Sequence, residues 1–244
     1  MRRLFLAALT ILITSAAFAQ TDTVAPRKGR TLKPGTLPRS NDHLVLQLGY
    51  TLWQGKSDSI NTSGIPRTFN AYFMLDFPFK TNPHWSVAVG AGIATDNIFF
   101  KETSIGIAAR TSTLSIRSVG DTNSFKKYKL ATTYLEAPIE LRFSSKPDDN
   151  RHSIKIAVGA KVGTMLNAHT KGKNLQDKNG NSVNDYKVKE YSKKFFNTNR
   201  LSVTGRIGYG NFSLFSSFQI TPLFKEGLGP TVRPLTIGLT LSGL

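Results

Sequence analysis

The chain has 244 residues and no cysteine, which excludes a fold held together by disulfides. It carries 32 Lys and Arg against 15 Asp and Glu, a formal net charge of +17 that favours anionic partners such as nucleic acid, phosphorylated lipid or acidic polysaccharide. The mean hydropathy of −0.20 argues against a bundle of membrane helices but not against a β-barrel, in which only every second residue of a strand faces lipid.

The N-terminus has the features of a signal peptide. Two arginines precede an apolar run from Leu4 to Ala17, and Ala17-Phe18-Ala19 matches the small-x-small pattern of a cleavage site. The run has roughly 14 residues, fewer than the ~20 that a spanning helix needs. We therefore expect residues 1–19 to be cleaved and the chain to be exported. Because an exported chain rarely meets nucleic acid, the charge favours lipid or glycan as the anionic partner. The alternative is a solubilising, positively biased surface without a ligand.

Two further segments follow. Residues 20–42 are rich in Thr, Pro, Arg and Lys, which is typical of a flexible tail, here expected in the periplasm. Residues 43–244 show no sustained helical period and instead alternate between apolar and small or polar residues. This alternation predicts a single all-β domain.

Eight stretches carry the alternation. They have 8 to 13 residues, close to the ~10 that a tilted strand needs to cross a bilayer, whereas strands of soluble sheets are usually nearer five or six. A soluble β-sandwich also alternates, but its polar face favours Thr, Lys and Glu, whereas Gly, Ser, Thr and Ala dominate here. The sequence therefore predicts an antiparallel transmembrane β-barrel of eight strands, at 43–53, 67–79, 85–94, 134–143, 154–163, 201–209, 212–220 and 235–242.

The connections alternate strictly between short and long. This is the layout of an outer-membrane barrel with short periplasmic turns and long extracellular loops. Residues 111–119 also alternate, and we expect them to form a hairpin beyond the membrane, with ten strands as the alternative count. The short connections are 80–83, 144–151 and 210–211, and the long ones are 54–66, 95–127, 164–199 and 221–233.

Aromatic residues cluster beside the short turns. They share the parity of the apolar face, where an interfacial belt would bury each ring close to polar headgroups. The residues are Phe77, Phe79, Trp85, Phe143, Tyr209 and Phe212.

Charged residues on the opposite parity are expected to face the lumen. An eight-stranded barrel has an interior just wide enough to be filled by side chains, so these charges should pair. Glu136 or Glu140 is expected to pair with Lys155 or Lys161 on the neighbouring strand. The predicted luminal network comprises Asp76, Glu136, Glu140, Arg142, Lys155, Lys161 and Arg206.

Catalytic and metal sites are not predicted. Glu136 and Glu140 are four residues apart on one strand, about 13 Å at ~3.3 Å per residue, beyond the ~5 to 10 Å that separates glycosidase carboxylates. The four histidines are too dispersed for a metal site. We therefore expect no enzymatic activity and no cofactor.

A basic segment at 164–200 interleaves lysines with aromatic residues. Lys187, Lys189, Lys193 and Lys194 are expected to face lipopolysaccharide phosphates at the outer leaflet. The alternative is a mobile, solvated loop without a ligand.

Three segments resemble a known family. Residues 43–53, the run YFMLDFPF at 72–79 and TYLEAPIELRF at 133–143 are similar to PorT-like outer-membrane β-barrel proteins. The resemblance covers about residues 43–244. It implies a barrel of this type, and the founding member of the family is tied to protein secretion.

Three classes of function follow. We expect an outer-membrane barrel with a structural or interaction role in the envelope, accessory to secretion as the resemblance implies. The alternatives are a narrow transport or channel barrel and an outer-membrane enzyme that modifies lipid. The expected partners are outer-membrane lipid, lipopolysaccharide and other envelope proteins.

Overall fold

The computed structural model describes residues 43–56 and 60–243, so the predicted signal peptide and the tail at 20–42 lie outside the described residues. Within the described part, no helix combines the length and the hydropathy of a membrane span. The elements are β1 (Leu44–Gln54), β2 (Arg67–Pro78), β3 (Trp85–Phe100), β4 (Thr103–Gly106), β5 (Ser115–Ser118), β6 (Ser124–Ser144), the 3-10 turn η1 (Asn150–His152), β7 (Ile154–Gln176), β8 (Ser182–Tyr191), β9 (Asn199–Tyr209), β10 (Phe212–Gln219) and β11 (Arg233–Ser242).

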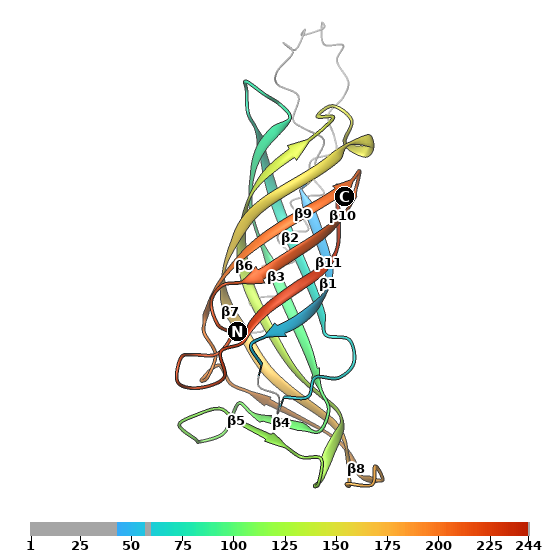
Figure 1. Ribbon diagram of the computed structural model, residues 1–244, viewed down its shortest axis with the longest axis vertical. Helices are drawn as coiled ribbons and strands as arrows, with labels where there is room; N and C mark the ends of the chain where they lie inside the picture. Colours follow the sequence, from blue (N-terminus) through green and yellow to red (C-terminus); the bar gives the residue numbers. More distant parts are fainter. Residues whose placement is uncertain (1–42, 57–59, 244) are drawn as a thin grey trace, which may run out of the picture. The chain divides into compact units, whose positions relative to one another are not determined.

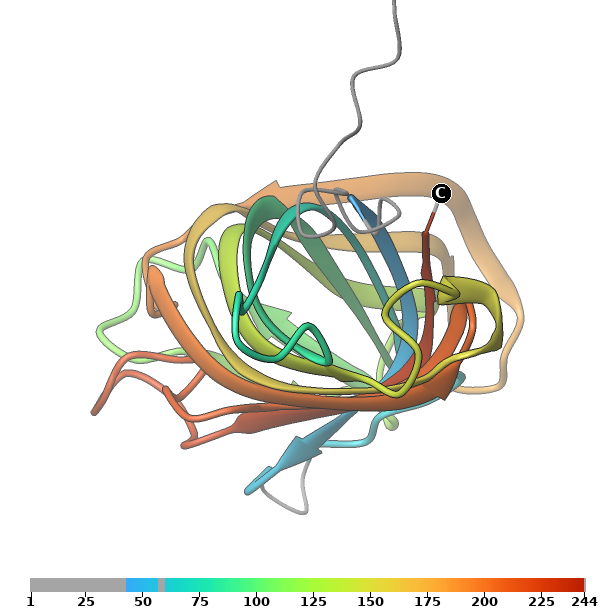
Figure 2. The same cartoon turned by 90° about the horizontal axis from the view of Figure 1, so that it is seen from above.

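Eight of these strands close into a ring. The antiparallel order runs β6-β3-β2-β1-β11-β10-β9-β7, and pairing of β6 with β7 completes the circle (Figure 2). The first and last strands pair from Val45–Ser242 to Gln54–Arg233, so the chain closes on itself without a free edge. The predicted eight-stranded antiparallel barrel is confirmed.

The two ends of the ring differ. The turns after β2, β6 and β9 lie at one end, here called the short-turn end, and β4, β5 and β8 lie at the other, the long-loop end (Figure 1). The tightest turn is Gly210-Asn211, between β9 and β10. Gly210 has a φ of +60°, and a Cβ there would lie 2.6 Å from the carbonyl oxygen of Arg151, so both backbone conformation and space require glycine.

The wall of the barrel is apolar outside and polar inside. Leu48 on β1 and Val158 on β7 are 64% and 63% exposed, whereas Gln47, next to Leu48, and Ser202, on β9, are buried. A soluble protein would hide the apolar set. Because a membrane supplies lipid around the wall, the outward apolar face is buried there instead.

The aromatic residues next to the short turns lie on this outer face. Phe77, Tyr209 and Phe212 are more than half exposed, and Trp85 packs on Phe143 with a centroid distance of 5.1 Å. They surround the short-turn end, as expected of a belt at a membrane interface.

Two of the expected long loops are wrong in extent. The segment 164–199 is largely strand, because β7 continues to Gln176 and β8 pairs back along it. Its alternation escapes a search by sequence because both of its faces carry polar residues. A register shift between β6 and β7 at Thr133/Tyr134 also reverses the parity of β7: Leu166 faces outward before it, and His169 after it.

The segment 95–127 is also shorter as a loop than expected, since β3 extends to Phe100 and β6 begins at Ser124. Within it, β5 pairs with β4 as a separate two-stranded sheet outside the ring. The hairpin expected at 111–119 therefore exists only in part, with its partner strand at Thr103–Gly106. The ten-strand alternative is wrong.

Candidate functional site in the barrel lumen

The lumen near the short-turn end contains a cluster of two acids and two arginines. Glu140 on β6 accepts from Arg142 Nε at 2.9 Å and from Arg206 Nη2 at 2.8 Å, and Arg142 also lies 3.5 Å from Asp76 on β2. Ser86 donates to Asp76 at 2.8 Å. We call Asp76, Glu140, Arg142 and Arg206 the short-turn cluster. It is balanced in charge, which reduces the cost of burying four ionised groups.

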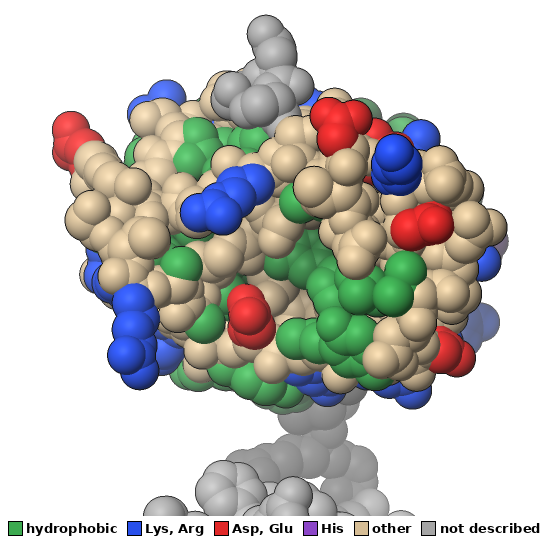
Figure 3. All heavy atoms as spheres, turned by 90° about the horizontal axis from the view of Figure 1, so that it is seen from below, with side chains coloured by type: hydrophobic (Ala, Val, Ile, Leu, Met, Phe, Trp, Pro, Cys, Tyr) green, Lys and Arg blue, Asp and Glu red, His purple; other side chains and the backbone are tan. Residues whose placement is uncertain are grey.

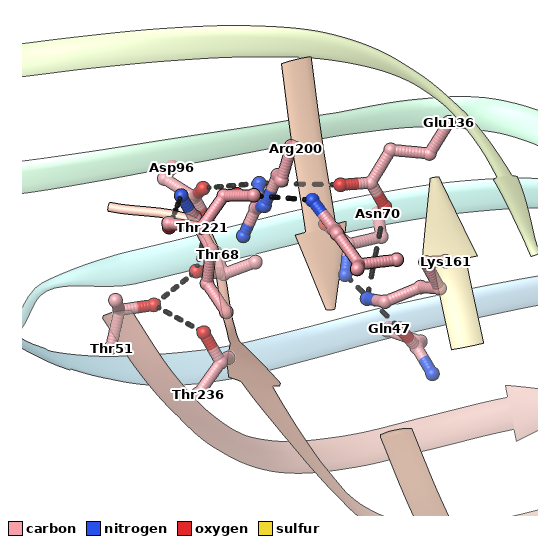
Figure 4. Close-up of polar contacts among 12 residues, drawn as sticks. Gln47, Thr51, Thr68, Asn70, Asp96, Glu136, Lys161, Arg200, Thr221 and Thr236 are labelled. Atoms are coloured by element: carbon pink, nitrogen blue, oxygen red, sulfur yellow. Dashed lines mark hydrogen bonds and ion pairs between the residues drawn. The ribbon is translucent and has the colours of Figure 1, made fainter. Parts of the chain in front are cut away.

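A second balanced cluster lies farther along the lumen (Figure 4). Arg200 Nη1 on β9 lies 2.9 Å from Asp96 on β3 and 3.3 Å from Glu136 on β6. Lys161 on β7 approaches Glu136 at 3.7 Å. This middle cluster, comprising Asp96, Glu136, Lys161 and Arg200, thus joins four strands across the barrel.

Neutral side chains add two hydrogen bonds and an aromatic contact to the middle cluster. Tyr72 donates a 2.6 Å hydrogen bond to Glu136, and Thr68 donates one of 2.6 Å to Asp96. The guanidinium of Arg200 stacks 4.7 Å above the ring of Tyr134. Because each buried charge has both an ionic partner and a hydrogen-bonding or aromatic neighbour, the cluster can persist inside the lumen.

Small residues make room for these long side chains. A Cβ at Gly163 would lie 2.8 Å from Cγ of Glu136, and one at Gly92 would lie 2.5 Å from the ring of Tyr72. Gly163 and Gly92 pair with Glu136 from its two sides. The abundance of small residues on the luminal face therefore follows from close packing.

The long-loop end of the lumen is filled by apolar side chains. Trp53 on β1 meets Phe224 edge to face at 6.0 Å, and Phe224 lies 5.1 Å from Phe196. This apolar cap combines inward side chains of the wall with side chains of all four outer connections. Its members include Trp53, Ile60, Ile98, Phe100, Ile105, Ile107, Leu114, Leu130, Tyr134, Met165, Phe195, Phe196, Leu223, Phe224 and Val232.

Backbone bonds lock the outer connections together in the cap. Asn197 bonds three times to the segment after β10: its backbone N–H donates to the carbonyl of Leu223 at 3.0 Å, and its side-chain amide donates to those of Pro222 at 2.7 Å and Phe224 at 2.9 Å. Lys225 donates to the carbonyl of Phe195 at 2.9 Å. Apolar side chains gather between the loops when this end is viewed directly, with charged side chains around them (Figure 3).

The structure brings six of the seven predicted luminal residues into the two clusters. The short-turn cluster contains Asp76, Glu140, Arg142 and Arg206, and the middle cluster contains Glu136 and Lys161. The seventh, Lys155, is half-buried near the short-turn end, opposite Ser144 and Gly208.

The sequence-based search missed Asp96 and Arg200. Both lie just beyond the predicted strand bounds, which ended at residue 94 and began at residue 201. Extending the parity of each strand by one or two residues would have placed both side chains in the lumen. Arg200 is the cation that joins Asp96 to Glu136.

The four lysines expected to face lipopolysaccharide occupy two places. Lys187 and Lys189 are exposed on β8, next to β7. Lys193 and Lys194 follow β8 and donate to backbone carbonyls, Lys193 to Met165 at 3.4 Å and Lys194 to Thr111 at 2.8 Å.

The described residues offer little to metal or acid–base chemistry. Glu136 and Glu140 belong to different clusters, and each is bonded to cations rather than facing a shared open space. Across 43–56 and 60–243, no three or more His, Cys, Asp or Glu side chains are grouped so that they could hold a metal ion. The arrangement is suited to filling and bracing the lumen.

A family model identifies the family to which this chain belongs. The comparison with curated proteins found no match. Among solved structures, Ail, the attachment invasion locus protein of Yersinia pestis, in complex with the heparin analogue sucrose octasulfate, matches with a TM-score of 0.35 and 16% identity, over 82% of this chain and 96% of that chain. The model of the outer membrane protein beta-barrel domain family matches residues 39–231. The chain therefore belongs to the outer membrane protein β-barrel domain family.

Proposed function

We propose that this protein is a closed, non-conducting and non-enzymatic barrel of the outer membrane that acts through its outer surface, as a structural or interaction element of the envelope. The observation that carries the proposal is the occupied lumen. Two charge-balanced clusters and the apolar cap lie in series along it.

The three layers oppose conduction for different reasons. The clusters place ion-paired side chains across the lumen, and removing one partner of a buried pair leaves uncompensated charge, at a cost of about 3 to 5 kcal/mol. The cap presents an apolar constriction, which an ion enters only by losing hydration. A channel would have to open all three layers at once, so this arrangement favours the interaction role over transport.

The PorT-like resemblance supplies the finer part of the proposal. Runs that resemble this family lie on β1, β2 and β6, all of which are strands of the ring. By this resemblance the barrel would be accessory to protein secretion, with other envelope proteins as partners. Export through the signal peptide at 1–19, a tail at 20–42 in the periplasm, and contact with lipopolysaccharide belong to the same proposal.

A planar-bilayer recording tests the central claim. The purified barrel is first shown to be folded by the change in its gel migration on heating (heat-modifiable migration). Added to a planar bilayer, it should give no discrete conductance steps, while a porin measured in the same chamber gives steps. Reproducible steps from the folded protein would sink the proposal in favour of a channel. Envelope fractionation tests the location, which should be the outer membrane.

A further inference from the structure

Part of the sheet continues beyond the ring at the long-loop end. Pairing of β7 with β9 ends at Thr164–Asn199, and pairing of β7 with β8 begins at His169–Tyr191. Strand β6 accompanies β7 as far as Ser124–Gln176. The outer parts of β6 and β7 therefore form, with β8, a three-stranded extension of the barrel wall.

Six lysines form two rows across this extension. Directly paired residues of an antiparallel sheet project to the same side. The first row is Lys129–Lys171–Lys189 and the second is Lys127–Lys173–Lys187, each running from β6 through β7 to β8. Neighbouring strands are about 4.8 Å apart and alternate residues about 7 Å apart, so the six amines occupy a compact patch. We call Lys127, Lys129, Lys171, Lys173, Lys187 and Lys189 the lysine grid.

The grid is on the outward face of the wall. On β6 it continues the parity of Leu135 and Ile139, which are 46% and 52% exposed on the lipid side. On β7 the register shift at Thr133/Tyr134 turns the odd-numbered residues outward, so that Lys171 and Lys173 join the same face.

The order of residues along this face gives the height of the grid. Beyond the apolar positions of β6 comes the pair His169–Tyr191, with ring centroids 5.3 Å apart, and the two lysine rows follow. Aromatic rings of this kind favour the boundary between acyl chains and headgroups. The lysines directly beyond it are therefore at the level of the headgroups of the outer leaflet.

The grid concentrates positive charge that the protein itself leaves uncompensated. Like charges directly opposite each other in a sheet are destabilising. Among the described residues, no ion pair joins a grid lysine to a carboxylate. Burial lowers the pKa of Lys129, and Lys171 and Lys189 lower it further. An anion bound here would relieve this repulsion.

The grid also includes a concave surface. Phe99 on β3 lies opposite Lys129, whose amine is 5.9 Å from the centre of the ring and donates to Asn97 at 2.6 Å. A groove of about 140 Å³ is lined by Phe99, Lys127, Tyr128, Lys129, Lys171 and Lys173. An apolar ring beside several amines suits a headgroup that carries both phosphate and an apolar or sugar face.

We propose that the lysine grid is the binding site for the phosphorylated headgroup of an outer-leaflet lipid, namely lipopolysaccharide. This inference rests on the proposed function in that it places the barrel in the outer membrane, and it names a partner of the outer surface. It moves the expected contact away from Lys193 and Lys194 and onto β6 and β7.

The test compares two variants with the same change of net charge. The site variant replaces Lys129, Lys171, Lys173 and Lys189 with Gln. The control replaces Lys126, Lys178, Lys193 and Lys194 with Gln, which lie outside the grid. Each protein, in neutral phosphatidylcholine nanodiscs, is titrated with lipopolysaccharide at two salt concentrations.

The site variant should bind at least tenfold more weakly than the parent and show a flatter salt dependence, because fewer charges are then screened. The control should stay within about threefold of the parent. Equal losses in both variants, or none in the site variant, would overturn the proposal.

Two further arms identify the source of the anion. Dephosphorylated lipopolysaccharide should bind the parent protein and the site variant with the same affinity. Millimolar inorganic phosphate should not compete with the intact lipid for the parent protein. Competition by free phosphate, or stronger binding of a sulfated polysaccharide, would contradict a lipid site. Heat-modifiable migration reports folding, and conductance tests the proposed function separately, so a failure of either proposal can be recognised.

Discussion

Arg200 determines whether the middle of the lumen is neutral. Its guanidinium pairs with Asp96 and Glu136, and it stacks on Tyr134. Removing only the cation would leave two carboxylates close together with Lys161 as the remaining base of the cluster. The loss of stability would therefore come mainly from leaving an uncompensated charge buried, and less from losing a favourable contact.

We expect Arg200→Met to lower the free energy of unfolding by about 3 to 5 kcal/mol. The measurement is the urea concentration at which half of the protein, in neutral detergent, has lost the gel migration of the folded barrel. Arg233→Met is the control, because Arg233 is exposed and should change stability by less than about 1 kcal/mol. Similar midpoints for the two variants would show that the middle cluster does not brace the barrel.

At the scale of an element, β8 is separable from the ring. The ring closes through β6–β7 and β7–β9, whereas β8 pairs with β7 alone among the described strands. Replacing residues 170–190 with Asn-Gly would join His169 to Tyr191, which already face each other, by a two-residue hairpin turn.

We expect this shortened protein to fold and insert, because the pairing that closes the ring is retained. Heat-modifiable migration and protection from protease in vesicles would show it. Removing the β9–β10 turn and β10 in the same way is the contrasting variant, since it opens the ring and should abolish insertion. Loss of insertion in the β8 variant would mean that the extension is needed for closure.

For the whole molecule, the cap and the charge clusters are seals in series. Phe195 and Phe224 are buried at the centre of the cap, where truncating a large apolar side chain costs about 3 to 5 kcal/mol. The double variant Phe195→Ser and Phe224→Ser should loosen the outer loops and leave the two charge clusters in the lumen in place.

We expect this double variant to be cleaved by protease in 192–198 or 220–232 faster than the parent, yet to remain silent in a planar bilayer. The silence follows because Arg200, Arg142 and Arg206 still bridge the lumen. Conductance from the cap variant alone would show that the cap is the sole barrier. Unchanged proteolysis would show that the loops are held by their backbone bonds.

The sequence alone predicted the barrel because its evidence is local. Alternation along a strand is fixed by a two-residue period, and lipid outside with a packed lumen inside imposes opposite chemistry on the two faces. Strand number, short turns and the outward aromatic residues all follow from residues close together in the chain. The pair Glu136–Lys161 was also within reach, since adjacent strands joined by a short turn have a restricted register.

The tertiary structure decided what depends on closure and register. Arg200 meets Asp96 across 104 positions of the chain, a contact that exists only when the ring closes. The lysine grid depends on the register shift at Thr133/Tyr134, which reverses the parity of β7 and aligns residues from three strands. The cap assembles side chains from four connections, each of which has too few apolar residues to form a core by itself. Local alternation thus determined the wall of the barrel, and long-range pairing determined what fills it and where its charge is concentrated.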